Sequence, residues 1–202
     1  MQIKVIVFDL YNTLVKIHNN QHFFAKIYRD SKDGFGLSLT DFTSLLMENE
    51  VEDVFHQLSP DFKNHYDQNI QILEDELASI DVFEETIEVL EELKKDHQLY
   101  LISNLASPYK GAVTQLKLDR YFSQLIYSCD VGFQKPNPTI FKLVEEHSGF
   151  SKNEILMVGD SFKSDVQGAQ QMGWKYLRIN RKSDNTREKE IKSLREISDY
   201  LK

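Results

Sequence analysis

The stretch Ile3-Lys4-Val5-Ile6-Val7-Phe8-Asp9 decides the fold, because an apolar run of strand length ends at a carboxylate. Such a run is typical of a buried strand in a parallel sheet. Ligands of open α/β sheets bind in the crevice outside the carboxyl ends of the strands. Asp9 is therefore a candidate nucleophile or metal ligand. For a lone Asp, the simpler interpretation is a residue that ends its strand by bonding its own backbone.

Further apolar runs of this kind alternate with segments of helical periodicity, and strand followed by helix, repeated, predicts an α/β fold with a parallel sheet. The expected strands end at Asp9, at Asn104, near Cys129, at Asp160 and near Asn180. The expected helices span residues 83–95, 107–118, 138–147, 164–172 and 191–201. Ser107-Pro108 and Asn137-Pro138 each place a capping residue before a proline, which is a helix-start signal.

The segment of residues 16–79 interrupts this alternation, because it contains amphipathic helical windows and no convincing strand. We expect helices at residues 21–29, 40–58 and 60–78, separated by the glycine-bearing loop 32–36 and by Ser59-Pro60. The aromatic residues of this segment fit the core of a small bundle. The sequence thus predicts a core domain of residues 1–15 plus 80–202 and an inserted helical domain of residues 16–79.

The composition excludes several classes of function. Of the 202 residues, 41% are hydrophobic, which is enough to form a hydrophobic core. The net charge of −8 opposes nucleic acid as a partner. Cys129 is the single cysteine, so an intrachain disulfide is excluded and a reducing compartment, the cytoplasm, is expected. The N-terminal apolar stretch is too short for a membrane span or a signal peptide. The charged run of residues 181–192 is interpreted as a solvated turn before a terminal helix.

Polar residues gather where the expected strands end. Ser103 and Asn104 offer a hydroxyl, a side-chain amide and backbone donors for an oxyanion, although Ser-Asn is also a common turn dipeptide. Lys135 precedes a proline, so it is a fixed charge for an anion or an ordinary surface lysine. Asp160 and Asp165 flank a turn after an apolar strand, where oxygen ligands suit Mg²⁺. Asp165 also fits a helix N-terminal acid, a role compatible with the first.

Taken together, these segments resemble the four ordered motifs of the haloacid dehalogenase superfamily, and the resemblance spans nearly the whole chain. The matching residues are Asp9-Leu10-Tyr11-Asn12-Thr13, Ser103-Asn104, Lys135 before Pro136, and Gly159-Asp160-Ser161 through Asp165. The resemblance implies a Rossmann-like core with a small helical cap that closes over small substrates. It also implies a hydrolase, most simply a Mg²⁺-dependent phosphatase of small phosphorylated metabolites.

The resemblance assigns a role to each matching residue. Asp9 would attack phosphorus and form an aspartyl-phosphate, while Ser103, Asn104 and Lys135 would hold the phosphoryl oxygens. Mg²⁺ would be bound by Asp9, the backbone carbonyl of Tyr11 and Asp160, with Asp165 organising the surroundings of the metal and of Lys135. A carboxylate can approach a phosphate dianion only when cations neutralise the negative charge.

Tyr11 departs from the phosphatase pattern, which has a second Asp at this place as general acid and base. A phenol is protonated at neutral pH, so it could donate a proton but would be a poor base; it is equally well a packing residue.

Tyrosine here also resembles the superfamily's metal-free 2-haloacid dehalogenases, which remain an alternative, as does a relative that binds phosphate or a partner without turnover. Asp160 favours the phosphatase, because two carboxylates without a cation repel each other. Arg29, the only arginine of the insertion, lies earlier than a dehalogenase would place it. The sequence leaves the natural substrate and the oligomeric state open.

Overall fold

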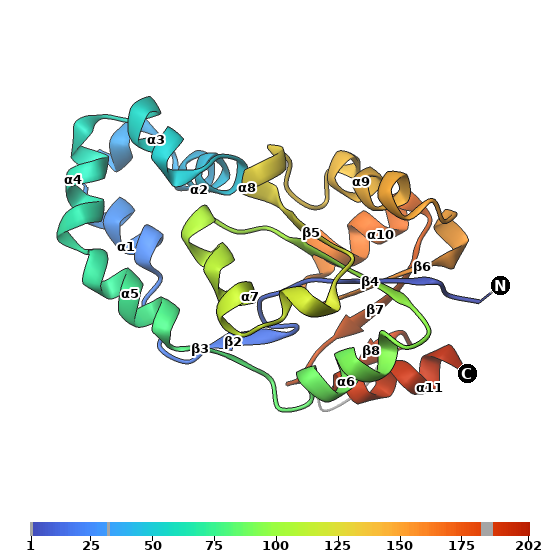
Figure 1. Cartoon of the computed structure of the whole chain (residues 1–202). Coiled ribbons are helices and arrows are strands. Elements are labelled where there is room, and N and C mark those ends of the chain that lie inside the picture. The colour runs from blue at the N-terminus through green and yellow to red at the C-terminus, as the bar shows by residue number, and fades with distance from the viewer. Residues whose placement is uncertain (1, 32, 183–187) are drawn as a thin grey trace.

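A parallel sheet forms the centre of the protein in the computed structural model, which describes residues 2–31, 33–182 and 188–202 (Figure 1). The strand order is β5-β4-β1-β6-β7-β8, and all neighbouring strands are parallel. The strands are β1 (Val5–Phe8), β4 (Gln98–Ser103), β5 (Gln124–Tyr127), β6 (Ile155–Gly159), β7 (Lys175–Ile179) and β8 (Glu190–Ile191). The predicted α/β fold with a Rossmann-like sheet is confirmed.

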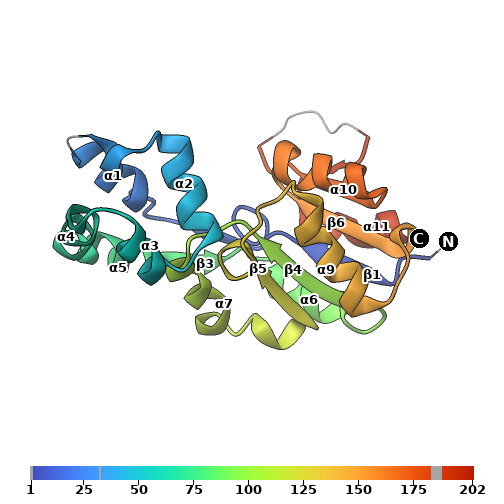
Figure 2. The same cartoon turned by 90° about the horizontal axis from the view of Figure 1, so that it is seen from above.

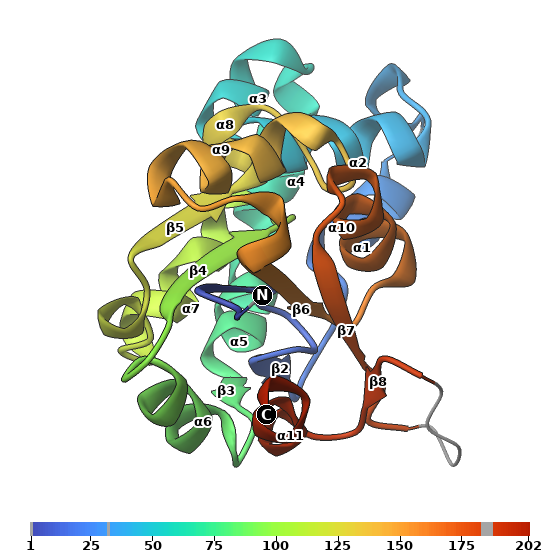
Figure 3. The ribbon, with the colours of Figure 1, turned by 90° about the vertical axis from the view of Figure 1, so that its right-hand side faces the viewer.

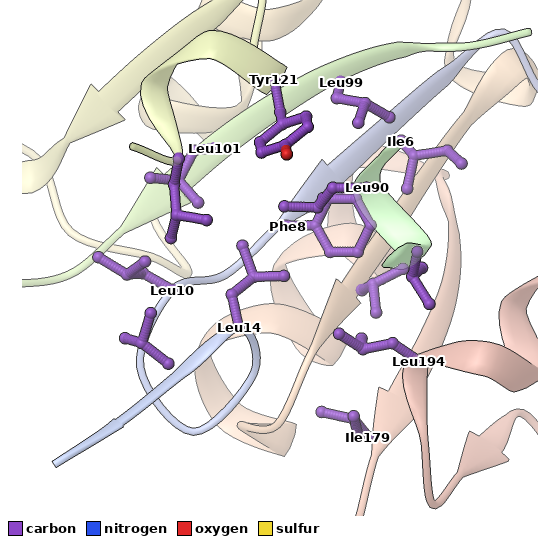
Figure 4. Close-up of a cluster of buried hydrophobic side chains, with 14 of the residues drawn as sticks. Ile6, Phe8, Leu10, Leu14, Leu90, Leu99, Leu101, Tyr121, Ile179 and Leu194 are labelled. Atoms are coloured by element: carbon purple, nitrogen blue, oxygen red, sulfur yellow. The ribbon is translucent and has the colours of Figure 1, made fainter. Parts of the chain in front are cut away.

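Strand β1 is buried on both sides, which explains its unbroken apolar run. Val5 and Val7 belong to the apolar layer on one face of the sheet, and Ile6 and Phe8 belong to the layer on the other. This division follows from the alternation of side chains along a strand. The first face is covered by α9 (Pro138–Ser148) and α10 (Gln167–Met172), and the second by α6 (Thr86–Leu93), α7 (Gly111–Gln115) and α11 (Ile197–Leu201) (Figure 3). Figure 4 shows the second layer, in which Phe8 lies beside Leu90.

Helices α1 to α5 lie together at one end of the sheet and are called the helical unit below (Figure 2). They are α1 (Phe23–Asp30), α2 (Leu39–Glu48), α3 (Val51–Gln57), α4 (Pro60–Gln68) and α5 (Ile70–Ala78). Their core is built from aromatic rings, since the buried ring of Phe62 contacts those of Phe35, Phe42, Phe55 and Tyr66. The division into two domains at residues 15 and 79 stays a prediction.

Two of the helices expected in this segment are each broken into two. The break after α2 falls at Asn49, whose side-chain amide donates to the Leu45 carbonyl, and the break after α4 falls at Asn69, which donates to the His65 carbonyl in the same way. An asparagine side chain that bonds backbone competes with helical hydrogen bonds. The predicted continuous helices at 40–58 and 60–78 are therefore wrong. In the described part of the chain, no helix is long and apolar enough to cross a bilayer.

A short antiparallel ribbon joins the helical unit to the sheet. Strand β2 (Val15–Ile17) pairs with β3 (Ile80–Val82), so the expectation that residues 16–79 hold no strand is wrong at residues 16 and 17. Three residues per strand are too few for a visible alternation of apolar and polar positions. The ribbon brings both connections of the helical unit to one place.

The helix-start signals had mixed outcomes. Asn137 accepts a hydrogen bond from the Thr139 amide and caps α9, as expected. Ser107 does not cap the helix that follows it, because its hydroxyl accepts from the amide of Val51 at the start of α3. That prediction is wrong, since a contact between segments distant in sequence has taken the capping group.

The charged run of residues 181–192 also differs from the prediction. Glu190 and Ile191 form β8, and the guanidinium of Arg181 pairs with Glu85 at 2.6 Å, so the run is not only a solvated turn. Its residues 183–187 lie outside the described residues.

Candidate active site

The site lies at the carboxyl edge of the sheet, where three adjacent strands end. Asp9 follows β1, Ser103 is the last residue of β4, and Asp160 follows β6; β1 lies between the other two. A cavity of about 240 Å³ at this edge is called the carboxylate cavity below. Its walls are formed by Asp9, Tyr11, Asn12, Ser103, Asn104, Lys135, Asp160, Ser161, Ser164 and Asp165. The structure therefore brings all seven residues singled out in the sequence to one place.

The ammonium group of Lys135 is held at the centre of this cavity. It donates to Asp9 Oδ1 at 2.6 Å, to Asp165 Oδ1 at 2.7 Å and to the carbonyl of Ile102 at 2.8 Å. Because an ammonium group has three protons, each one has an acceptor. The side chain is 2% exposed, so Lys135 is a buried cation and not a surface lysine.

Asn104 fixes the backbone of Lys135. Its side-chain oxygen accepts from the Lys135 amide at 2.8 Å, and its side-chain nitrogen donates to the Lys135 carbonyl at 2.9 Å. The amide expected to face an oxyanion is thus used to hold the lysine loop. One of the two protons on the side-chain nitrogen is used in this way, so the other is the only donor of this side chain left for a substrate.

Asp165 is placed by the turn that follows β6. Its Oδ1 accepts from Lys135, and its Oδ2 accepts from the amide of Ser161 at 2.9 Å. The carboxyl group fits against Gly159, where an added Cβ would lie 2.2 Å from Asp165 Oδ2. Only glycine at position 159 leaves room for this carboxylate.

The charges in the carboxylate cavity do not balance. Three carboxylates, those of Asp9, Asp160 and Asp165, face the single ammonium of Lys135, which leaves two negative charges uncompensated when all are ionised. Burial raises the pKa of Asp9 to about 7; Lys135 opposes this shift, and Asp165 adds to it. Burial and the nearby Asp165 also raise the pKa of Asp160. Burial acts to lower the pKa of Lys135, but Asp165 and Asp9 outweigh it and raise that pKa.

The donor set fits a divalent cation. Asp9, Asp160 and Asp165 each offer a carboxylate oxygen, and these oxygens lie within 4.8 Å of one another. Hard oxygen donors with an excess of negative charge are the ligands that Mg²⁺ takes in proteins. Both oxygens of Asp9 and both oxygens of Asp165 accept hydrogen bonds, so an ion bound here would add to these contacts or replace some of them.

The hydroxyl of Ser103 is a buried polar group in the wall of the cavity that has no hydrogen-bond partner. The residue is 1% exposed, and its Oγ has no hydrogen-bond partner; within the described ranges, the only other buried side-chain atom in this state is Nε of Arg181. A buried polar group without a partner costs stability, which is a common property of groups that serve a ligand.

Tyr11 uses its hydroxyl away from the carboxylates. The phenol donates to the backbone carbonyl of Tyr109 at 2.9 Å, and the two rings meet edge to face at 6.0 Å between centroids. Burial, more than any neighbouring charge, raises the pKa of the Tyr11 phenol, so the group stays protonated. This geometry favours the packing interpretation of Tyr11 over an acid–base one.

Three residues to which the sequence analysis gave no role support the segments after β1 and β6 that carry Asp9 and Asp160. Thr13 donates its hydroxyl to Asp9 Oδ2 at 3.2 Å, and Arg181 donates to the Thr13 carbonyl at 2.9 Å. Arg178 donates to the carbonyl of Asp160 at 3.0 Å. Thr13 could have been found from its place in the first motif, four residues after Asp9, whereas nothing near the arginines in the sequence points to the site.

Fold and cavity together define an α/β enzyme with its polar site at the carboxyl edge of the sheet. The sequence matches the haloacid dehalogenase-like hydrolases over residues 3–173. The chain therefore belongs to this family and is a hydrolase, which confirms the resemblance seen in its motifs.

Individual relatives include both phosphatases and dehalogenases. Glyceraldehyde 3-phosphate phosphatase of Pyrococcus furiosus is 28% identical over 193 residues, covering 86% of this chain and 79% of that protein. (S)-2-haloacid dehalogenase of Pseudomonas putida is 28% identical over 225 residues, covering 98% and 96%. The crystal structure of a phosphatase of this family from Thermococcus onnurineus matches with a TM-score of 0.71 and 25% identity, covering 98% of each chain.

Proposed function

We propose that this hydrolase is a Mg²⁺-dependent phosphatase of small phosphorylated metabolites that acts through an aspartyl-phosphate on Asp9. The observation that carries the proposal is the unpartnered, buried hydroxyl of Ser103 in the same cavity as Asp9 and the Lys135 ammonium. A phosphoryl group supplies the oxygens that this hydroxyl lacks. The phosphatase names of the Pyrococcus and Thermococcus relatives support the same substrate class. The cytoplasmic location expected from the single cysteine stays a prediction.

Magnesium fits the charge of the cavity and the donor set. Asp9, the backbone carbonyl of Tyr11 and Asp160 would hold the ion, with Asp165 keeping Lys135 in place. When bound, Mg²⁺ supplies the positive charge that lets a phosphate dianion approach a carboxylate. Without it, the two uncompensated negative charges of the cavity repel the substrate.

The reaction has two steps on Asp9. In the first, an oxygen of Asp9 forms a bond to phosphorus, and the bond from phosphorus to the alcohol oxygen breaks, with its electron pair remaining on that oxygen. The alkoxide takes a proton from water. In the second step, water attacks the phosphorus, the Asp9 carboxylate leaves, and phosphate and a proton are released. Ser103 and Lys135 hold the phosphoryl oxygens in both steps, and for this Lys135 exchanges its hydrogen bond to Asp9 Oδ1 for one to a phosphoryl oxygen.

Acid catalysis is the weak part of this site. The proton of Tyr11 is donated to the Tyr109 carbonyl, so it does not point at a leaving group in the carboxylate cavity. General acid–base help is typically worth about 10²–10⁴-fold in rate. We therefore expect phosphates with good leaving groups, such as aryl phosphates, to be hydrolysed faster than alkyl phosphates.

The dehalogenase alternative has less support. A metal-free mechanism gives Asp160 no function, and its charge beside Asp9 would be repulsive. The arginine that a 2-haloacid would require is also missing from the place where it is needed. Arg29 is exposed, its Nε donates to the Ala25 carbonyl of its own helix, and it does not line the carboxylate cavity.

Release of phosphate from 4-nitrophenyl phosphate, measured with Mg²⁺ and with a chelator, tests the proposal. We expect turnover only with Mg²⁺, and loss of turnover in Asp9→Asn. Halide release from 2-chloropropionate in the presence of chelator, without any phosphate release, would replace the phosphatase by the dehalogenase. No turnover of either substrate under any of these conditions would overturn the proposed function.

A further inference from the structure

A second cavity adjoins the carboxylate cavity. It has a volume of about 360 Å³, lies between the helical unit and the sheet, and is called the apolar cavity below. Tyr11 and Asn104 line both cavities, so the two spaces share part of their walls. Because the two spaces adjoin, the apolar cavity is a candidate site for a group bonded to a phosphate in the carboxylate cavity.

The walls of the apolar cavity are mostly apolar. Phe23, Phe24 and Tyr109 present aromatic rings, and Met47 and Leu105 add aliphatic surface. Among its described lining residues there is no lysine and no arginine. An uncharged group with an apolar body is the occupant that such walls stabilise by burial.

Glu76 is the one acidic residue in these walls, and it is buried, with 2% of its surface exposed. Its carboxyl oxygens accept from the hydroxyl of Tyr109 at 2.8 Å and from the amides of Gln21 at 3.1 Å and Phe23 at 3.3 Å. Within the described residues, Glu76 forms no ion pair, because its hydrogen-bond donors are neutral groups. Its negative charge therefore has no cation to balance it.

A second anionic group in the apolar cavity would face this carboxylate without a compensating cation. Repulsion between like charges is strong where water is excluded. His22 lines the cavity and is exposed; it is the one lining side chain that can become positive by protonation. The selectivity is thus best measured at pH 8, where histidines are ordinarily neutral.

We propose that the apolar cavity selects phosphate monoesters whose alcohol is uncharged and largely apolar, and that Glu76 excludes substrates with a second anionic group. This inference rests on the proposed phosphatase function and deepens it. It assigns Glu76 to the choice of substrate and not to the chemical steps.

The experiment compares three substrates of similar size that differ in charge: phenyl phosphate, 4-(hydroxymethyl)phenyl phosphate and 4-carboxyphenyl phosphate. With Mg²⁺ at pH 8, we expect kcat/KM for the carboxylate to be at least about tenfold below that of the two neutral substrates. Equal values for all three would overturn the inference and leave the phosphatase function standing. No phosphate release from any of them would overturn both.

Variants of the walls sharpen this test. Glu76→Gln should raise the relative kcat/KM for the carboxylate substrate by removing the repulsion. Because Glu76 also holds the start of α1, a second variant avoids any loss of folding: Met47→Lys adds a cation to a partly exposed position of the same wall. It should raise the relative kcat/KM for the same substrate about tenfold, whereas the neutral control Met47→Gln should leave that ratio unchanged. Equal ratios in Met47→Lys and Met47→Gln would contradict the inference.

Discussion

The carboxylate cavity and the apolar cavity share walls but are built in opposite ways. In the first, charged side chains are fixed by hydrogen bonds, as the three bonds of Lys135 show. In the second, rings and aliphatic groups surround one buried carboxylate, that of Glu76, to which only neutral groups donate among the described residues. Under the proposed function, the sheet edge carries the chemistry on a phosphoryl group, whereas the helical unit contributes a surface that discriminates between alcohols.

The largest effect should come from removing the nucleophile. Asp9→Asn should lower turnover of aryl phosphates by more than about 10³-fold, because an amide oxygen does not attack phosphorus as a carboxylate does. Circular dichroism should show an intact fold, since the change is nearly isosteric. Asp119→Asn, on the exposed surface, is the matched control and should keep full turnover. Retained activity in Asp9→Asn would show that the reaction does not take place on Asp9 at the sheet edge.

Gly159→Ala should have the next largest effect. The new Cβ would lie 2.2 Å from Asp165 Oδ2, so that carboxylate must move and Lys135 loses one of its acceptors. A displacement of about 1 Å in a catalytic group can cost about 10²-fold in rate, and we expect kcat to fall by that order. Gly111→Ala is the matched control, because nothing lies within 4 Å of its added Cβ. Similar kcat values in both variants would show that Asp165 does not place the lysine.

Position 11 should show a smaller and substrate-dependent effect. Tyr11→Asp would supply the acid–base group that the site lacks, so it should raise turnover of butyl phosphate about tenfold or more and that of phenyl phosphate less. Tyr11→Phe is the control; losing the bond to the Tyr109 carbonyl should cost about 1 kcal/mol of stability and leave turnover of phenyl phosphate nearly unchanged. Equal or lower rates for both substrates in Tyr11→Asp would show that this position cannot serve acid–base chemistry.

The smallest effect should come from a contact between the helical unit and the segment that follows β4. Ser107→Ala leaves the buried amide of Val51 without its acceptor at 2.9 Å, and we expect a loss of about 1 kcal/mol in the free energy of unfolding in urea. Turnover should change by less than about twofold, because neither residue lines the carboxylate cavity. Ser44→Ala, within α2, controls for the loss of a hydroxyl. A large loss of turnover in Ser107→Ala alone would show that the position of the helical unit limits the chemistry.

Much of the sheet edge could be predicted from the sequence because its signals are local. Strands β1, β4 and β6 each contain an unbroken apolar run, and Asp9, Ser103 and Asp160 lie at or just after the ends of these runs. Parallel strands bring such residues to one edge whatever the intervening loops do. The convergence of the polar residues was therefore predictable, whereas their individual bonds were not.

The remaining details depend on contacts between distant segments, which leave no local pattern. The side chain of Asn104 forms hydrogen bonds with the backbone of Lys135, and the hydroxyl of Ser107 accepts a hydrogen bond from the amide of Val51. In the sequence, however, Ser103-Asn104 looks like an ordinary turn and Ser107-Pro108 like an ordinary helix cap. The helix breaks at Asn49 and Asn69 fall where a side chain competes for backbone carbonyls. A periodicity of apolar residues cannot report such competition.

Two arginines that support the segments carrying Asp9 and Asp160 lie beyond the part of the chain that the family match covers. That match ends at residue 173, yet Arg178 and Arg181 hold the carbonyls of Asp160 and Thr13. A protein shortened after α10 would keep every motif residue and lose both of these arginines, together with strands β7 and β8. A protein shortened in this way would therefore keep the reactive side chains but lose part of the structure that holds them in position.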